Sequence, residues 1–102
     1  MEMTSELKGR LDMIPAHCRA EMSNYIEHGR RPGNFLCAVL TNNLFMTHVH
    51  ADDVNRDRIM DYITFLSSYA PPNCFGSRVK FEAWIEDATE RRAMAHLAGP
   101  QP

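Results

Sequence analysis

Two histidines one residue apart, His48 and His50, are followed by an aspartate at position 52, which is a spacing typical of metal-dependent hydrolases. On a helix, side chains two residues apart point about 200° apart, so only an extended segment would bring both imidazoles to one metal. A zinc site also needs three or four ligands at fixed geometry. We therefore expect no metal, with His48 and His50 exposed and with Asp52 or Asp53 capping the next helix.

Acidic pairs suited to general acid–base catalysis are the other candidates for chemistry. They lie on predicted polar helix faces where arginines and lysines alternate with them, which is typical of solvated ion-pairing surfaces. The sequence contains no glycine-rich phosphate loop, no G-x-S-x-G elbow and no kinase signature. We expect no enzyme, no catalytic residues and no cofactor.

The three cysteines, Cys18, Cys37 and Cys74, are widely spaced and include no C-x-x-C pair. This pattern indicates reduced thiols rather than a disulfide framework. Because a free cysteine behaves as a small hydrophobic residue, Cys18 and Cys37 are expected in the core.

Two turns combine basic side chains with the start of a helix, where free amides and the positive end of the helix dipole attract anions. The first turn precedes a helix beginning near residue 35, and the second precedes one beginning near residue 78. Guanidinium groups at these places suit a phosphate. The predicted anion-binding residues are Arg30, Arg31, Gly33, Asn34, Ser77, Arg78 and Lys80.

The chain has 102 residues and a formal net charge of −2, with 44% hydrophobic and 24% charged residues. This composition is that of one ordinary globular domain, and the charge argues against general affinity for nucleic acid or anionic membranes. No apolar run approaches the roughly 20 residues of a membrane span. The polar start of the chain does not resemble a secretory signal. We expect a cytoplasmic protein without a membrane partner.

Helical periodicity organises the chain into four main segments. A helix is expected from Pro15 to His28, closed by Gly29, and a second from residue 35, with Asn34 as its N-cap. A third begins at Asp52 or Asp53 and continues to residue 70, where two prolines stop it. A fourth follows Ser77, and residues 93–97 extend it or form a fifth helix.

The fold class predicted from these segments is all-α, a compact four- to five-helix bundle with short loops. A single domain covers residues 1–102, with a flexible lead-in at 1–13 and a disordered tail at 98–102. Apolar side chains beyond the predicted stripes, at Phe45, Met46 and Phe65, indicate a partner surface. A second copy of the same chain is the simplest partner for such a surface, so a homo-oligomer is expected.

The stretch from Ile14 to Ile85 resembles small helical proteins, mostly uncharacterised, that phages, prophages and other mobile elements encode. The resemblance includes Ala51 and both aspartates after it, but not His48 and His50. It rests on Tyr25–Gly29, Pro32–Leu36, Ala38–Leu40, Asn42–Leu44, Ala51–Arg56, Phe65–Leu66, Ala70–Pro71, Cys74–Ser77 and Ala83–Ile85. What it implies is a setting, because small phage accessory proteins often act by binding and many counter host defence.

These observations favour a non-enzymatic accessory binding protein that antagonises a host defence system. It would bind a defence protein or sequester a small phosphorylated signal. The alternatives are a helix-turn-helix-like DNA-binding regulator and, less favoured, a metal-dependent hydrolase using His48, His50 and Asp52. Against the DNA-binding alternative, no predicted helix carries the run of basic and amide side chains that reads base edges.

Overall fold

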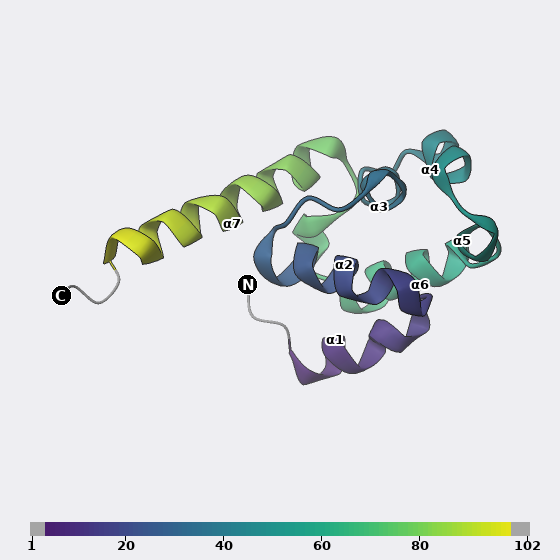
Figure 1. Cartoon of the computed structure of the whole chain (residues 1–102), viewed down its shortest axis with the longest axis horizontal. Coiled ribbons are helices and arrows are strands. Elements are labelled where there is room, and N and C mark those ends of the chain that lie inside the picture. Colours follow the sequence, from purple (N-terminus) through teal and green to yellow (C-terminus); the bar gives the residue numbers. More distant parts are fainter. Residues whose placement is uncertain (1–3, 99–102) are drawn as a thin grey trace.

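The computed structural model describes residues 4–98, and it describes side chains for residues 4–94. The described residues form helices and contain no strand, which confirms the all-α class (Figure 1). The predicted number of helices is too low, because seven α-helices and two 3-10 helices lie within this range. They are α1 (Ser5–Gly9), η1 (Arg10–Met13), α2 (Ala16–His28), α3 (Asn34–Leu40), α4 (Leu44–His50), α5 (Asp53–Asp57), α6 (Ile59–Tyr69), η2 (Pro72–Cys74) and α7 (Arg78–Ala98).

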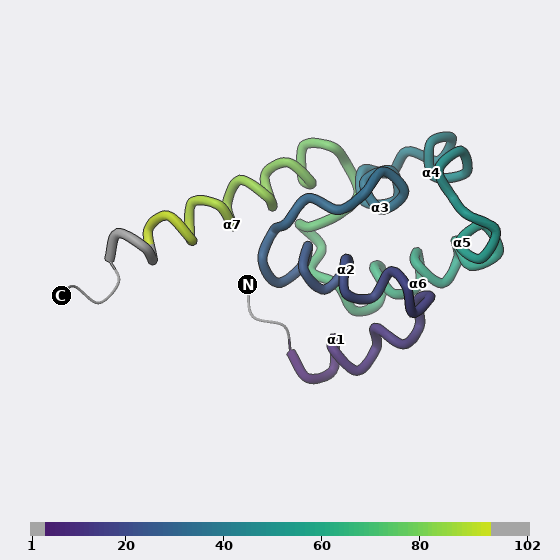
Figure 2. The backbone as a smooth tube through the Cα atoms, viewed as in Figure 1, coloured from purple at the N-terminus to yellow at the C-terminus, as the bar shows by residue number. Residues whose placement is uncertain are grey.

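The molecule is elongated, with extents of 51 × 27 × 21 Å, because α7 projects from the globular part formed by the other helices (Figure 2). Helix α7 begins beside the globular part, and its second half extends away from it (Figure 1). Among the side chains of α7 that the structure describes, the buried ones, Phe81, Trp84 and Ala88, lie in its first half.

Residues 5–13 of the lead-in expected to be flexible form α1 and η1, and Thr4 is the N-cap of α1. The Thr4 hydroxyl caps α1 by accepting the N–H of Leu7 at 3.1 Å, and the Leu7 side chain is 3% exposed. The buried leucine, the capped first turn and the Arg19 side chain, which donates to the Leu11 carbonyl at 3.1 Å, hold this segment on the core. The tail expected at 98–102 lies outside the described residues except for Ala98, which ends α7.

Helix α2 matches its prediction. Pro15 precedes it and Gly29 closes it in the left-handed conformation, with φ +64° and a backbone bond from its N–H to the Tyr25 carbonyl at 2.8 Å. Its predicted core side chains, at positions 18, 22, 25 and 26, are all buried.

The second predicted helix is divided into α3 and α4 by Asn42 and Asn43. Asn42 adopts φ +61°, a conformation that asparagine tolerates better than most residues, and the Asn43 side chain accepts the Met46 N–H at 3.2 Å. The predicted N-cap role of Asn34 is wrong, since Gly33 holds that position and Asn34 is the first helical residue. Two adjacent asparagines therefore end one helix and begin another.

The third predicted helix is also divided, at Arg58. Its start is confirmed, because the Asp52 carboxylate accepts the Asn55 N–H at 2.7 Å, and its end before Pro71 is confirmed as well. Arg58 leaves the helical conformation, with φ −115° and ψ +13°, and its guanidinium donates to the Met13 carbonyl at 2.8 Å. Arg58 thus joins the α5–α6 junction to η1.

One aromatic cluster connects α2, η2 and α7. The Tyr25 and Phe81 rings stack at 5.3 Å, the Trp84 indole N–H donates to the Tyr25 carbonyl at 3.0 Å, and the Tyr25 hydroxyl donates to the Cys74 carbonyl at 2.5 Å. Phe65, expected outside the core, is fully buried and packs within it. The buried face of α6 consists of Tyr62, Phe65 and Leu66, while Met60 and Ile63 are exposed, so the helix is rotated relative to the predicted stripe.

Asn55 is the polar centre of the interior, at 3% exposure. Its Oδ1 accepts the Tyr62 hydroxyl at 2.6 Å, and its Nδ2 donates to the Cys18 sulfur at 3.6 Å. Burial raises the pKa of Tyr62 far above its usual value, so this hydroxyl stays protonated and must donate. The side chain of Asn55 therefore pairs polar atoms of α2 and α6.

Replacing Asn55 with alanine should lower the free energy of unfolding by about 2 kcal/mol, because it leaves the buried Tyr62 hydroxyl without an acceptor. Urea denaturation measures the change. The loss should be smaller in a Tyr62→Phe background, which has no hydroxyl to leave unpaired, and the exposed Asn24→Ala is the control. An equal loss in both backgrounds would contradict the assigned hydrogen bond.

The contacts of Asp52 predict that the free energy of unfolding depends on pH. The Asn55 N–H bonded to its carboxylate, and then His17 at 2.9 Å, lower the pKa of Asp52. A depressed folded-state pKa stabilises the fold above the unfolded pKa, near 3.9, and this contribution disappears as pH falls through the folded value. Thermal melting should therefore show Asp52→Asn less stable than wild type at neutral pH and equal to it in strong acid. Asp57→Asn should show no such convergence.

Candidate functional site

Helix α4 presents apolar side chains to solvent and a polar one to the interior. Thr47 is its one buried residue, at 5% exposure, and the Thr47 hydroxyl bonds back to the Asn43 carbonyl at 2.7 Å. Leu44, Phe45 and Val49 are 72%, 82% and 64% exposed. This distribution is the reverse of an ordinary amphipathic helix, whose apolar stripe faces the core.

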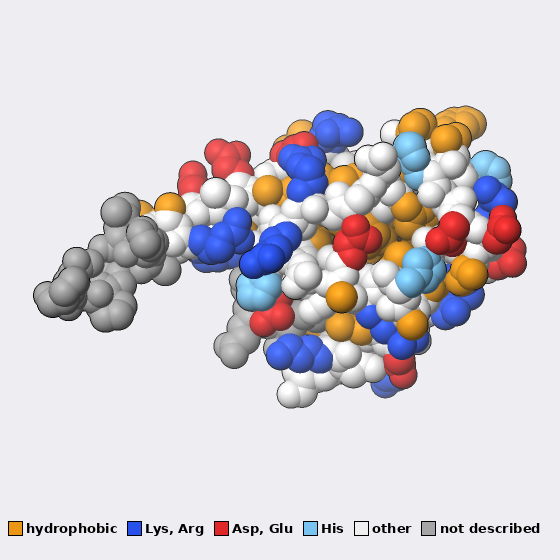
Figure 3. All heavy atoms as spheres, viewed as in Figure 1, with side chains coloured by type: hydrophobic (Ala, Val, Ile, Leu, Met, Phe, Trp, Pro, Cys, Tyr) orange, Lys and Arg blue, Asp and Glu red, His pale blue; other side chains and the backbone are white. Residues whose placement is uncertain are grey.

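Four apolar side chains form what we name the α4 face: Leu44, Phe45, Met46 and Val49. Hydrophobic side chains gather at the upper right over α4 in Figure 3. Successive residues of a helix are rotated by about 100°, so these four side chains lie on the solvent-facing side of α4 when Thr47 faces the interior. Such contiguous exposed apolar surface marks sites of interaction.

A groove runs along one side of α4, between the α3–α4 turn and α6. It consists of two adjoining hollows, of about 50 and 220 Å³, that share Val39, Asn42 and Ile63. Leu44 lies at one end, and Phe75 and Gly76 lie at the other. We name it the α4–α6 groove. It continues the apolar surface of the α4 face onto α6.

The segment beside the α4 face is acidic. Residues 52–61 contain four aspartates and two arginines, and acidic side chains cluster over α5 in Figure 3. Arg56 pairs with Asp53 at 3.4 Å and Arg58 pairs with Asp61, so both arginines are already partnered within the chain. The margin of the apolar surface therefore carries net negative charge.

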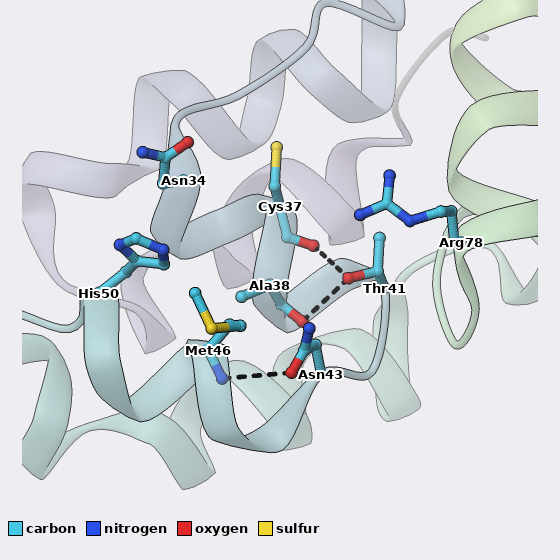
Figure 4. Close-up of a pocket in the computed structure, with 8 residues that line it drawn as sticks. All are labelled: Asn34, Cys37, Ala38, Thr41, Asn43, Met46, His50 and Arg78. Atoms are coloured by element: carbon cyan, nitrogen blue, oxygen red, sulfur yellow. Dashed lines mark hydrogen bonds between the residues drawn. The ribbon is translucent and has the colours of Figure 1, made fainter.

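A polar pocket lies on the other side of α4 (Figure 4). Its volume is about 170 Å³. Asn34 and His50 stand at one end and Arg78 at the opposite end, with α3 between them (Figure 4). The lining residues are Asn34, Cys37, Ala38, Thr41, Asn43, Met46, His50 and Arg78. None of them is acidic.

The polar pocket brings together Asn34 and Arg78, one residue from each predicted anion-binding turn. It does not include the others. Arg30 is exposed on the α2–α3 connection, and Arg31 lies over the Phe81 ring at 5.4 Å. The Gly33 N–H donates to the Glu21 carboxylate at 2.5 Å, so this amide already has an anionic partner.

Ser77 and Lys80 are engaged in local structure rather than in the pocket. The Ser77 hydroxyl caps α7 by accepting the Lys80 N–H at 3.1 Å, and α7 follows Ser77 as predicted. The Lys80 ammonium approaches the Pro72 carbonyl at 3.5 Å. Their predicted role in anion binding gains no support from these positions.

Glu82 connects the two predicted turns. One of its oxygens accepts from Arg31 at 2.5 Å, and the other accepts from Arg78 at 3.4 Å. Hydrogen bonding from Arg31, followed by the charges of Arg31 and Arg78, lowers the pKa of Glu82, which keeps it ionised. The bond to Arg78 exceeds the usual 2.7–3.2 Å of an N–H···O bond, so Arg78 is held only weakly.

The two histidines of the opening motif lie on α4, where residues two apart point about 200° apart. His50 lines the polar pocket, whereas His48 is not part of it. Within residues 4–94, no three His, Cys, Asp or Glu side chains lie close enough to hold a metal ion. His50 stands with Asn34 at the end of the pocket opposite Arg78 (Figure 4).

Burial raises the pKa of Cys37, against the opposing effect of Arg31, and its thiol donates to the Pro32 carbonyl at 3.2 Å. The same cause raises the pKa of Cys74 to about 12. Both thiols are therefore neutral at physiological pH and poor nucleophiles. The prediction of reduced cysteines agrees with the free thiols at positions 18, 37 and 74.

Val49 and the pocket residues Thr41 and Asn43 were not identified from the sequence as functional. Their positions at the surface and in the pocket result from the break at Asn42–Asn43, which rotates α4 relative to α3. Two consecutive asparagines are a turn signal, and this signal was available in the sequence. A continuous helix would instead have placed Leu44 on the core stripe.

No helix within the described residues is both long and apolar enough to cross a lipid bilayer. Comparisons with models of protein families, with curated proteins and with solved structures gave no match.

Proposed function

We propose that this chain is a non-enzymatic binding protein that attaches to a partner protein through the α4 face. The observation that supports this most is the reversed polarity of α4, whose Phe45 and Val49 side chains are 82% and 64% exposed while Thr47 is buried. Exposing several large apolar side chains on one short helix is unfavourable in water. A partner that covers them recovers this free energy.

The partner is expected to offer an apolar segment flanked by basic residues. The α4–α6 groove accepts apolar side chains, and residues 52–61, with four aspartates against two arginines, attract a basic margin. A second copy is the competing occupant, as the predicted homo-oligomer requires. Two copies meeting at α4 would bring two acidic segments to one interface, which repels. These charges favour a different protein as the partner.

The resemblance of Ile14–Ile85 to small proteins of phages and mobile elements supplies the biological setting. In that setting, we infer that the partner is a component of a host defence system and that binding inhibits it. The defence role rests on the resemblance, and the mode of attachment rests on α4. Binding without catalysis needs no metal or cofactor.

The test is phage plating on a host whose defence system the wild-type chain suppresses. Phe45→Ser combined with Val49→Ser should abolish suppression, whereas Val79→Ser should not, because Val79 is equally apolar and 79% exposed but lies on α7. The proposal would be refuted if the double variant suppressed the defence system as well as the wild type does. It would also be refuted if the wild type suppressed no defence system.

A further inference from the structure

We propose that the polar pocket is a second binding site, and that it takes the phosphoryl group of a small phosphate monoester. The site lies on the flank of α4 opposite the α4–α6 groove, and it shares Met46 with the α4 face and Asn43 with the groove. Its recognition chemistry depends on three elements that converge on one hollow: the start of α3, the end of α4 and the start of α7 (Figure 4).

The lining of the pocket supplies hydrogen-bond donors and contains no acid, although Glu82, outside the lining, pairs with Arg78. The side chains of Asn34 and His50 make no hydrogen bond or ion pair with other described residues, so both are available to a ligand. Asn43 uses its Oδ1 to accept the Met46 N–H at 3.2 Å, which leaves its amide nitrogen to donate. Arg78 adds a guanidinium group, whose planar set of N–H donors matches a phosphate.

The size of the pocket limits the ligand. A volume of about 170 Å³ is smaller than the roughly 300–1,000 Å³ of pockets that enclose drug-sized ligands. One phosphoryl group fits inside, and the remainder of the ligand lies in solvent or against the Met46 side chain. Whole dinucleotides are too large for the pocket to enclose.

Glu82 sets the charge of the site. It faces both Arg31 and Arg78, and its bond to Arg78, at 3.4 Å, is long enough to yield when a phosphate arrives. A phosphate carries more charge than one carboxylate and presents more acceptor oxygens. Arg78 therefore exchanges a weak partner for a stronger one, while Arg31 remains with Glu82.

Titration of the full chain with inorganic phosphate, followed by amide NMR shifts, tests the site. The wild type should show saturable shifts in residues 34, 43 and 78. Arg78→Gln should raise the Kd for phosphate at least about tenfold, which corresponds to the loss of one charge-assisted interaction of about 1.4 kcal/mol. Glu82→Gln should strengthen phosphate binding, because it releases Arg78. Arg30→Gln is the matched control and should change nothing.

Three results would overturn the proposal: shifts that do not saturate, equal weakening by Arg30→Gln and Arg78→Gln, or weaker binding in Glu82→Gln. Each variant's thermal melting midpoint is measured first, since loss of binding in an unfolded variant says nothing about the pocket. If Arg78→Gln unfolds, Asn34→Ala replaces it with the same expected direction. None of these substitutions touches the α4 face, so failure here leaves the proposed function standing.

Discussion

Replacing Gly29 with alanine should lower the free energy of unfolding by about 3 kcal/mol. Two independent costs add. A Cβ at φ +64° is strained by about 1–2 kcal/mol, and the added carbon would lie 2.2 Å from the Ala88 Cβ, an overlap that costs about 1–3 kcal/mol to relieve. The neighbouring atom belongs to a short side chain on a rigid helix, so it cannot move aside. Urea denaturation measures the loss.

Gly9→Ala is the matched control for that substitution. Gly9 has φ −67°, and no atom lies within 4 Å of an added Cβ, so alanine there should be neutral or slightly stabilising. Introducing Gly29→Ala into an Ala88→Gly background should reduce its cost to about 1–2 kcal/mol, because only the backbone strain remains. An undiminished loss in that background would contradict the described contact between α2 and α7.

The second large effect concerns binding. Phe45→Ser with Val49→Ser should weaken attachment to the partner protein by at least about 100-fold, since apolar anchors at an interface centre contribute about 2 kcal/mol or more each. The same substitutions should change the free energy of unfolding by only about 0.5 kcal/mol, because both side chains are mostly exposed. Calorimetric titration and urea denaturation measure the two quantities separately.

Val79→Ser completes that comparison. It removes the same kind of exposed apolar side chain outside the α4 face, so its affinity for the partner should equal that of the wild type. Wild-type affinity in the Phe45 and Val49 double variant would show that α4 does not hold the partner. A large loss of stability in that variant would show that these side chains are not free in the isolated chain.

Local chemistry explains why much of the fold was predictable. Gly29 closes α2, Asp52 caps α5, and the two prolines at 71 and 72 stop α6, each through a backbone effect that a few neighbouring residues determine. These signals placed helix ends correctly without knowledge of the tertiary structure. The all-α class followed from helical periodicity alone.

The internal breaks depended on interactions that periodicity does not encode. Arg58 interrupts α5 and α6 while donating to the Met13 carbonyl, 45 positions earlier in the chain. Leu7 looked like part of a flexible lead-in because its partners lie in distant helices. Long-range contacts of this kind override local propensity.

The structure groups the predicted anion-binding residues differently from the sequence, and only Asn34 and Arg78 line one pocket. From the sequence, the donor groups of both turns were expected to be available to an anion. In the structure, the Glu21 carboxylate accepts the Gly33 N–H, and Glu82 pairs with Arg31. Neither carboxylate is close in sequence to the group it pairs with, so the pairing was not predictable. The polar pocket appeared only when α3, α4 and α7 were placed together.

The central claim is that α4 attaches to a different protein. Photo-crosslinking in living host cells tests this claim most directly. A photoreactive phenylalanine analogue replaces Phe45 in one variant and Val79 in another, and the cross-linked products are identified by mass spectrometry. We predict one host protein joined at position 45 and absent at position 79. Cross-links at position 45 only to a second copy of the chain, or the same products from both positions, would contradict the claim.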